Sequence, residues 1–487
     1  MIGNTSKCIS ADSLTGILFG VEGIRNVIVL LNGPMGCKFY HSTTSHFLMD
    51  RPPLYLPVTE DGRKVEVDYN YMNDWFFRQS QVPCTYLDTY DYVYGSADKV
   101  EEAMRYIRDH VNFDLFVVVN SPGASLIGDN LKELTGKVLP DKLTVHIESP
   151  GFSESYAWGY EAAAINMLKQ LSGVMLTNPS ELASTIMNSK SNTDGNSDGF
   201  GIMSTSLPKS INLLGLSIWH RYAAGDREEL VRLFEKCGVK VNCCLFSGCS
   251  LEEIKAMPRA DLNIVIHPDM ALETARYLEE TYGTPYYVCD GPPIGFEATE
   301  RLFEEISARL DVDISSIITE LEQARGTVWY KVNQIYTSFG LPKGVTFAVE
   351  GSLSMAYSYT RFMGEYLGMT PECVAYEEAY PAYLQVKMTD LLSELQAENT
   401  LCILGNANTP DSENASSASK LYDTKAELVF SNANVISSLM TRRDAFCGIE
   451  ISLPGMGYTD IIPKTHLGIR GTMFLTEQIL NGLMSKL

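Results

Sequence analysis

The sequence predicts an α/β fold built on parallel sheets, because buried-strand patterns alternate along the chain with amphipathic helical patterns. Apolar runs typical of buried strands recur at residues 27–31, 115–119, 143–147, 211–216, 262–266, 345–349, 401–404 and 428–430. Between them lie apolar stripes with helical spacing, such as Val100, Met104, Ile107 and Val111, or the stripe in residues 384–395. This alternation is typical of βαβ units, so we expect parallel sheets flanked by helices.

The length of the chain predicts more than one hydrophobic core. At 487 residues it accommodates roughly three domains of about 150 residues each. We therefore expect three Rossmann-like domains, in residues 1–190, 191–340 and 341–487. Two polar stretches interrupt the alternation of strands and helices. Residues 188–210 are expected to form a mobile loop or linker, and residues 409–420 a surface loop.

The charge and cysteine content exclude several classes of partner and compartment. The 38 basic and 60 acidic residues give a formal net charge of -22, which repels phosphate backbones and anionic membrane surfaces. We therefore expect no nucleic acid and no membrane as partners. The 11 cysteines, an odd number, fit a reduced cytoplasmic protein better than a disulfide framework. The sequence also shows no leader pattern and no apolar run near the roughly 20 residues that span a bilayer.

Several common binding motifs are missing from the chain. There is no Gly-x-x-x-x-Gly-Lys-[Ser/Thr], and no complete Gly-x-Gly-x-x-Gly follows a predicted strand. We therefore expect that no nucleotide binds this chain directly. The absence of Cys-x-x-Cys also argues against a zinc ribbon or a thioredoxin-type site.

The turn after the first predicted strand carries the most informative cysteine. Gly33 and Gly36 allow the backbone to pass close to a bulky group, and Cys37 closes the turn with a thiol that can ligate iron. An earlier cysteine, Cys8, precedes another predicted element. The alternative is that Cys37 is a small buried hydrophobic residue, and spacing alone favours that alternative.

The order of motifs along the chain resembles the nitrogenase component 1 family, which includes the α and β chains of molybdenum-iron proteins, cofactor-assembly homologues and tetrapyrrole-reducing relatives. The segments that carry the resemblance here are residues 7–8, 20–24 and 32–37. It implies that Cys8 and Cys37 hold an iron-sulfur cluster of the 4Fe-4S type, which two subunits can share. It also implies that Gly33 and Gly36 lie against this cofactor.

One cysteine of the family pattern is absent. The third family cysteine falls on or beside Pro122, which offers no side-chain ligand. Cys84 is the only other cysteine in the first third of the chain, so we expect it to be the replacement ligand. Two alternatives stay open: Cys84 is an ordinary partly buried thiol, or a partner subunit completes the ligand set.

Two further residues take positions that the family uses near its active-site cofactor. His267 follows a predicted strand where α-type chains have a cofactor-ligating cysteine, and Tyr160 stands where those chains place a histidine. The resemblance therefore makes His267 and Tyr160 candidate catalytic residues. A lone histidine at a strand end is more often structural, and a phenol is a weak proton donor near neutral pH.

The second half of the chain is most similar to β-type subunits, at residues 349–351, 359–367 and 455–471. The resemblance implies an oxidoreductase subunit that receives electrons from a separate P-loop iron-sulfur reductase and reduces a tetrapyrrole or another small molecule. The expected partners are that reductase and a homologous subunit, identical or different. The alternatives are a noncatalytic β-type partner, a scaffold for metallocofactor assembly, and an α/β binding protein without metal.

Overall fold

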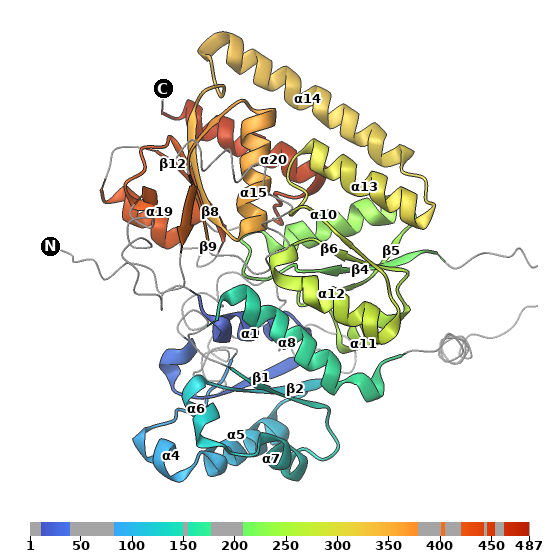
Figure 1. Cartoon of the computed structure of the whole chain (residues 1–487), viewed down its shortest axis with the longest axis vertical. Helices are drawn as coiled ribbons and strands as arrows, with labels where there is room; N and C mark the ends of the chain where they lie inside the picture. Colours follow the sequence, from blue (N-terminus) through green and yellow to red (C-terminus); the bar gives the residue numbers. More distant parts are fainter. Residues whose placement is uncertain are drawn as a thin grey trace, which may run out of the picture.

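Three parallel sheets form the framework of the molecule, as seen in a computed structural model that describes residues 11–38, 82–149, 154–176, 208–377, 401–404, 420–442, 446–452 and 462–486. Figure 1 shows the sheets following one another along the chain, each with helices on its faces. Every strand pairing in the described residues is parallel. The predicted α/β class is confirmed.

The N-terminal sheet has the strand order β1-β2-β3, with β1 (Val27–Asn32) paired in register with β2 (Leu115–Asn120). Its alternating side chains separate two layers of helices, as the two-residue period of a strand requires. Val27, Val29 and Leu31 pack on one side, while Ile28 and Leu30 pack on the other. The third strand of this sheet is β3 (Thr144–Glu148). The helices α1 (Ser13–Glu22) and α8 (Tyr156–Gln170) pack on the first side, and α5 (Ala97–His110) and α7 (Leu131–Val138) pack on the second.

The middle sheet has the strand order β5-β4-β6-β7. Its strands are β4 (Ser210–Leu214), β5 (Lys240–Cys244), β6 (Leu262–Val265) and β7 (Tyr286–Val288), and the helices in this part of the chain are α10 (Ala223–Lys236), α11 (Leu251–Lys255), α12 (Pro268–Tyr282) and α13 (Phe296–Leu310). The long helix α14 (Ser315–Phe339) then leads to the third sheet.

The C-terminal sheet has the strand order β10-β9-β8-β11-β12. Its strands are β8 (Thr346–Gly351), β9 (Thr370–Glu377), β10 (Leu401–Leu404), β11 (Leu428–Asn432) and β12 (Cys447–Ser452), with helices α15 (Leu353–Arg361), α19 (Ala433–Met440) and α20 (Gly468–Met484). Residues 359–367, one of the segments similar to β-type subunits, form the end of α15 continued by a π-helical turn, η6 (Phe362–Tyr366). The predicted stripe at 384–395 lies outside the described residues.

The three sheets are joined by hydrophobic cores that cross between them. One core contains Leu31 of the first sheet together with Leu214 and Val265 of the second. Another contains Ile211 of the second sheet together with Phe347 of the third. The shared cores pack the three sheets against one another. The domain boundaries near residues 190 and 340 stay a prediction.

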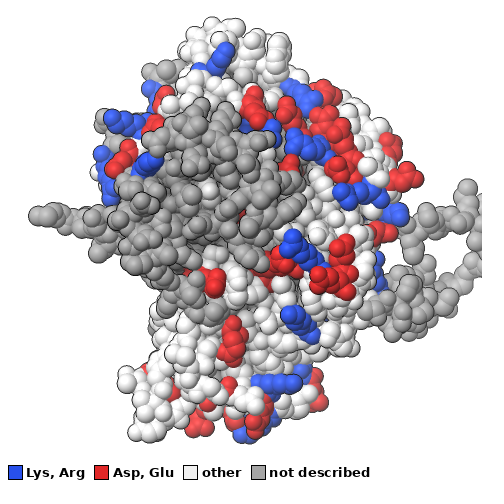
Figure 2. All heavy atoms as spheres, viewed as in Figure 1, with Lys and Arg blue, Asp and Glu red and all other residues white. Residues whose placement is uncertain are grey.

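The surface shows mixed charge over much of the face drawn in Figure 2, where acidic and basic side chains alternate beside α12, α13 and α14. The part of the N-terminal lobe formed by α4 (Thr89–Tyr94) and α6 (Pro122–Ile127) is mainly uncharged in this view. No helix in the described part of the chain is both long and apolar enough to cross a membrane.

Candidate functional site

Cys37 and Cys84 lie together at the carboxyl edge of the N-terminal sheet. Cys37 is in the short helix η2 (Met35–Lys38), directly after β1. The Cys84 segment runs parallel to the last residues of β1: the Leu31 amide donates to the Pro83 carbonyl at 2.9 Å, and the Thr85 amide donates to the Leu31 carbonyl at 3.0 Å. The carboxyl edge of a parallel sheet is where α/β proteins usually bind ligands.

A buried hydrogen-bond network fixes the end of β1 and therefore the turn that carries Cys37. The Asn32 side-chain amide donates to the Asn120 side chain and to the Ser96 hydroxyl, both at 2.9 Å. The Thr85 hydroxyl donates to the Asn32 side-chain oxygen at 2.9 Å and accepts from the Gly33 amide at 3.0 Å. Such fully paired buried networks are rigid, so the turn starts from a fixed point.

The two glycines of this turn have different surroundings. A Cβ on Gly33 would lie 2.7 Å from the Ser121 hydroxyl oxygen, so close packing against Ser121 explains this glycine. A Cβ on Gly36 would meet no described atom within 4 Å. No described residue fills the space beside Gly36, and a cofactor role for Gly33 and Gly36 stays a prediction.

The segment that lacks the family cysteine lies at the same edge of the sheet. The Ser121 amide donates to the Asn32 carbonyl at 2.9 Å, and Pro122 is the first residue of α6. Tyr92 covers this turn, because a Cβ on Gly123 would lie 2.8 Å from the Tyr92 ring. The fold thus places the position of the missing ligand next to the turn of Cys37.

A buried lysine sits beside the two cysteines. Lys38 is 2% exposed, and its ammonium group donates to the Val82 carbonyl at 2.7 Å and contacts Cys84. Burial raises the pKa of Cys84, and Lys38 opposes that effect. Burial also raises the pKa of Cys37, with smaller contributions from Asp12 and Cys84, so the two thiols are close enough to affect each other.

Replacing Lys38 by Met is expected to lower the free energy of unfolding by about 2 kcal/mol, because the change removes a buried hydrogen bond and the cation next to Cys84 and Glu22. Urea unfolding would measure this loss. The control is Lys137→Met, whose side chain is 60% exposed and pairs with Glu101 at the surface, with an expected loss below about 1 kcal/mol. Equal losses in the two variants would contradict the role assigned to Lys38.

The described residues supply only part of a cluster ligand set. Thiolates are the usual ligands of iron-sulfur clusters, which generally need four. Within the described ranges no group of three or more His, Cys, Asp or Glu side chains could hold a metal ion. Cys8 lies outside those ranges. Cys37 and Cys84 therefore fit the chemistry of such a cluster as two of its thiolate ligands, and further ligands are required to complete the set.

His267 is not at this edge but in a second, internal site between the middle and C-terminal sheets. It precedes α12, is 3% exposed, and lies with its ring centroid 4.2 Å from that of His220. Among the described residues, its Nδ1 has no hydrogen-bond partner. Burial lowers the pKa of His220 to about 4 and that of His267 well below its ordinary value, so both rings are neutral near pH 7.

These histidines line a small cavity. Its volume is about 10 Å³, which is room for about one water molecule. Other polar side chains reach it from all parts of the second half of the chain. They are Tyr222, Asp226, Tyr359 and His466. The site can hold or transfer a proton, but it has no space for a metallocluster in this conformation.

Tyr160 lies in α8 and does not line that cavity. Its hydroxyl donates to the Leu216 carbonyl at 2.8 Å, with a second carbonyl, that of Leu245, at 3.2 Å. The side chain is 1% exposed, and burial raises its pKa. In this structure Tyr160 joins the N-terminal and middle sheets, and its catalytic role stays a prediction.

Sequence reasoning missed Lys38, His220 and His466. For Lys38 a signal was present, since a lysine directly after a candidate ligand can lie close to the bound group. His220 and His466 carried no such signal, because only the three-dimensional packing of distant segments brings them to the cavity.

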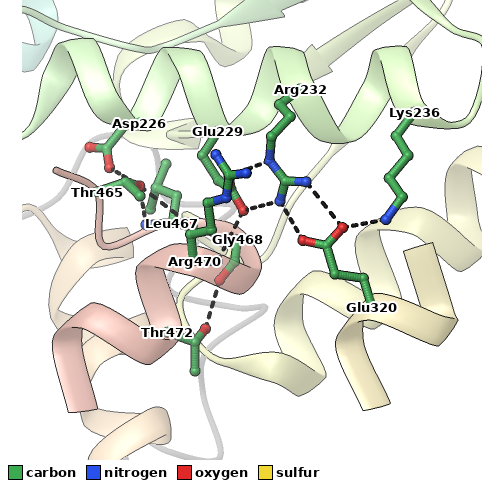
Figure 3. A network of polar contacts seen from close by, with 10 residues as sticks. All are labelled: Asp226, Glu229, Arg232, Lys236, Glu320, Thr465, Leu467, Gly468, Arg470 and Thr472. Carbon is green, nitrogen blue, oxygen red and sulfur yellow. Dashed lines mark hydrogen bonds and ion pairs between the residues drawn. The ribbon is translucent and has the colours of Figure 1, made fainter. Parts of the chain in front are cut away.

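A polar network ties α10 to α14 and α20 next to the cavity, and Figure 3 shows its side chains converging from these three helices. The Asp226 carboxyl accepts from the Thr465 hydroxyl at 2.7 Å and from the His466 amide at 3.1 Å. The Glu229 carboxylate accepts from the Arg470 amide at 3.0 Å. The middle sheet is thereby fixed to the start of α20.

Comparison with known proteins assigns the family. The model of the nitrogenase component 1 type oxidoreductases matches residues 14–484, so the chain belongs to that family. Its fold is similar to that of a solved nitrogenase, "Nitrogenase Cp1 at pH 6.5", with a TM-score of 0.70 and 17% identity, covering 100% of this chain and 95% of that one.

Curated relatives include the B-type subunits of light-independent protochlorophyllide reductase. The protein from Nostoc punctiforme is 35% identical over 116 residues, which are 23% of this chain and 22% of the relative. The protein from a Nostoc sp. strain is 26% identical over 281 residues, which are 56% of this chain and 51% of the relative. The chain therefore spans about a fifth to about half the length of these relatives.

Proposed function

We propose that the chain is a subunit of a nitrogenase-like reductase and that Cys37 and Cys84, with Cys8, contribute thiolates to an iron-sulfur cluster of the 4Fe-4S type. The observation that carries the proposal is the placement of Cys37 and Cys84 at one sheet edge beside the buried Lys38. When bound, the cluster would relay single electrons. Lys38 would offset part of the negative charge of the thiolates.

The electron donor in this proposal is a separate ATP-dependent iron-sulfur reductase. The chain itself has no phosphate-binding Gly-rich motif, which fits such a division of labour. The relatives named above are subunits of a protochlorophyllide reductase, which supports a tetrapyrrole or another small molecule as substrate. The cavity of His267 is too small for a tetrapyrrole, so that substrate would bind outside it.

A mainly uncharged, aromatic surface next to Cys37 supports a homologous partner subunit at the cluster. Seven large apolar side chains are exposed on η2, α4, α6 and the segment after Cys84, with exposures from 38% to 89%. They are Met35, Tyr86, Tyr90, Tyr92, Val93, Tyr94 and Leu126. Exposed apolar patches of this kind mark protein interfaces, and a subunit placed here would shield the cluster from water and supply further ligands.

Iron and acid-labile sulfide analysis after anaerobic purification tests the proposal. The wild-type chain is expected to contain a cluster, and Cys37→Ala and Cys84→Ala are each expected to lose most of the bound iron. The control is Cys447→Ala on β12, a partly exposed cysteine like Cys37, which is expected to keep the full iron content.

A wild-type chain that contains no iron even when it is expressed together with its homologous subunit would contradict the redox proposal. Full iron content in Cys84→Ala would remove Cys84 from the ligand set. Turnover with an added reductase separates a reductase subunit from a scaffold for cofactor assembly, which would bind a cluster and release it without turnover.

A further inference from the structure

Another, larger cavity lies between α13 and α15, which Figure 1 shows as neighbours. Its lining comes from residues 287–302, between β7 and the middle of α13, and from residues 357–366 of α15 and η6. We call it the α13/α15 pocket. Ile294 lines both this pocket and the cavity of His267, so the two are adjacent but distinct. The volume of the pocket is about 60 Å³. This is room for roughly four to six water molecules, or for a molecule of about six non-hydrogen atoms.

The beginning of α13 gives the pocket three backbone donors. The N-cap of the helix is Gly295, which has no side chain to cap the first turn. The first backbone hydrogen bond of the helix runs from the Thr299 amide to the Gly295 carbonyl, at 3.2 Å. Within the described ranges the amides of residues 296–298 have no hydrogen-bond partner, and all three residues line the pocket. Unpaired amides at a helix N-terminus favour a negatively charged group.

A buried hydroxyl without a partner lines the same pocket. Ser358 of α15 is 7% exposed. In the part of the chain that the structure describes, its hydroxyl makes no hydrogen bond. The backbone of Gly291 packs directly against this hydroxyl, because a Cβ on Gly291 would overlap the Ser358 Oγ. A hydroxyl buried without a hydrogen bond costs free energy, so an acceptor bound in the pocket would recover it.

The charged side chains of the lining largely neutralise one another. Arg301 donates to Asp290 at 2.9 Å. Arg361 donates twice to Glu365, at 2.9 and 2.8 Å. The remaining carboxylate of the lining, that of Glu297, is exposed. The amides of α13 and the Ser358 hydroxyl are therefore the polar groups left to select a ligand, and Glu297 opposes an anion.

The rest of the pocket is walled by aromatic rings. Phe362 and Tyr366 stack with ring centroids 5.5 Å apart, and Phe296 meets Tyr366 edge-on at 5.7 Å. Phe362 and Tyr366 are the first and last residues of the π-helical turn η6, and such turns occur frequently at functional sites. These walls favour an apolar body next to the polar group that the amides bind.

We propose that the α13/α15 pocket binds a short-chain organic monocarboxylate. The carboxylate accepts hydrogen bonds from the amides of residues 296–298 and from Ser358, while the hydrocarbon chain lies against Phe362 and Tyr366. Because α13 and α15 belong to different halves of the second core, the ligand joins the middle and C-terminal parts of the chain. None of these residues is a proposed cluster ligand, so the site is expected in the iron-free chain, and failure of either proposal leaves the other standing.

Titration calorimetry of the full-length chain with sodium butyrate, which has six non-hydrogen atoms, tests the proposal. The wild type is expected to bind one butyrate with a Kd of about 1 mM, and to bind n-butanol and n-butylammonium at least about 10-fold more weakly. Butyrate should also raise the Tm, because it binds only the folded chain. Ser358→Ala is expected to weaken butyrate binding about 10-fold. The Tm of this variant without ligand would show that it is folded.

A charge substitution at the mouth of the pocket checks the sign of the ligand. Glu297→Gln removes the carboxylate nearest to the amides and is expected to strengthen butyrate binding roughly 2- to 5-fold. The control is Glu304→Gln, which makes the same change at an exposed residue of α13 outside the lining and should leave the affinity unchanged.

Four outcomes would overturn the proposal. They are no butyrate binding at about 20 mM, binding of n-butanol or n-butylammonium as tight as that of butyrate, an unchanged affinity in a folded Ser358→Ala, and weaker butyrate binding in Glu297→Gln than in Glu304→Gln. The second outcome would indicate a purely apolar or a cation-binding pocket.

Discussion

Replacing Gly159 by Ala is expected to lower the free energy of unfolding by more than about 3 kcal/mol. Gly159 lies where α8 crosses α1, and a Cβ there would overlap the carbonyl oxygen of Ser13. Gly16 makes the reciprocal contact, since its Cβ would overlap the Tyr156 carbonyl. Both obstacles are backbone atoms, so no change of side-chain rotamer relieves them and the two helices must separate.

Gly136→Ala is the matched control for this prediction. Gly136 lies inside α7, and a Cβ there would meet no described atom within 4 Å. Because Ala is the better helix former, this variant is expected to gain roughly 0.5–1 kcal/mol. Urea unfolding of the two variants and the wild type measures both effects. A loss at Gly159 no larger than about 1 kcal/mol would show that α1 and α8 can shift apart at little cost.

The crossing of α1 and α8 also affects the proposed cluster. Helix α1 precedes β1, and Asp12 at its N-terminus is close enough to raise the pKa of Cys37. Separation of α1 from α8 would therefore move Asp12 and the start of α1 relative to Cys37. We expect Gly159→Ala to bind less iron than the wild type even under conditions in which it is mostly folded.

The parts of the fold that follow from sequence are those with a strong local pattern. The run that became β1 is apolar throughout because both faces of the strand are buried, and the stripe of α5 has one apolar face. Four strands were missed because their patterns are weak. β5 carries Lys240 and Asn242, β7 has three residues, β9 contains Pro371, and β12 is interrupted by Glu450.

The candidate site follows from sequence only in part. The position of Cys37 at the end of β1 followed from the sequence, because the strand and its Gly-rich end are adjacent in the chain, whereas the family resemblance was needed to make Cys37 a candidate ligand. The position of Cys84 beside Leu31 depends on a parallel bridge between segments far apart in sequence, which no local pattern encodes. The cavity of His267 depends likewise on the packing of α10, α15 and α20 against the end of β6, so its other side chains could not be predicted.

Replacing Asp226 by Asn is expected to remove a pH dependence of stability that amounts to about 4 kcal/mol. Asp226 is 7% exposed, and burial raises its pKa to about 7, although hydrogen bonds from Thr465, His466 and the Leu467 amide oppose the rise. A raised pKa means that the folded state binds the proton more tightly than the unfolded state, whose value is near 3.8. The stabilisation by the neutral carboxyl is complete below pH 3.8 and is lost as the pH rises to about 7.

Asn keeps the oxygen that accepts from Thr465 and His466, but it cannot ionise. The difference in unfolding free energy between Asp226→Asn and the wild type should therefore be small at pH 4 and grow in favour of the variant up to pH 8.

Other buried groups also titrate in this range. The lowered pKa of His220 destabilises the folded state as the pH falls from about 6.5 to about 4, and Glu161, whose pKa is raised to about 8, acts in the same direction as Asp226. Because His220 and Glu161 are present in both proteins, their contributions cancel in the difference.

Asp313→Asn is the control, because hydrogen bonds from Ser315 lower the pKa of this exposed carboxyl. The difference in unfolding free energy between Asp313→Asn and the wild type should be slight. As the pH rises, this difference should change in favour of the wild type, opposite to the change for Asp226→Asn. Urea unfolding at pH values from 4 to 8 measures all three proteins. A difference for Asp226→Asn that does not change with pH would mean that the carboxyl is ionised in the folded protein throughout this range. The contact between α10 and the start of α20 would then consist of hydrogen bonds from neutral amide and hydroxyl donors to an ionised carboxylate.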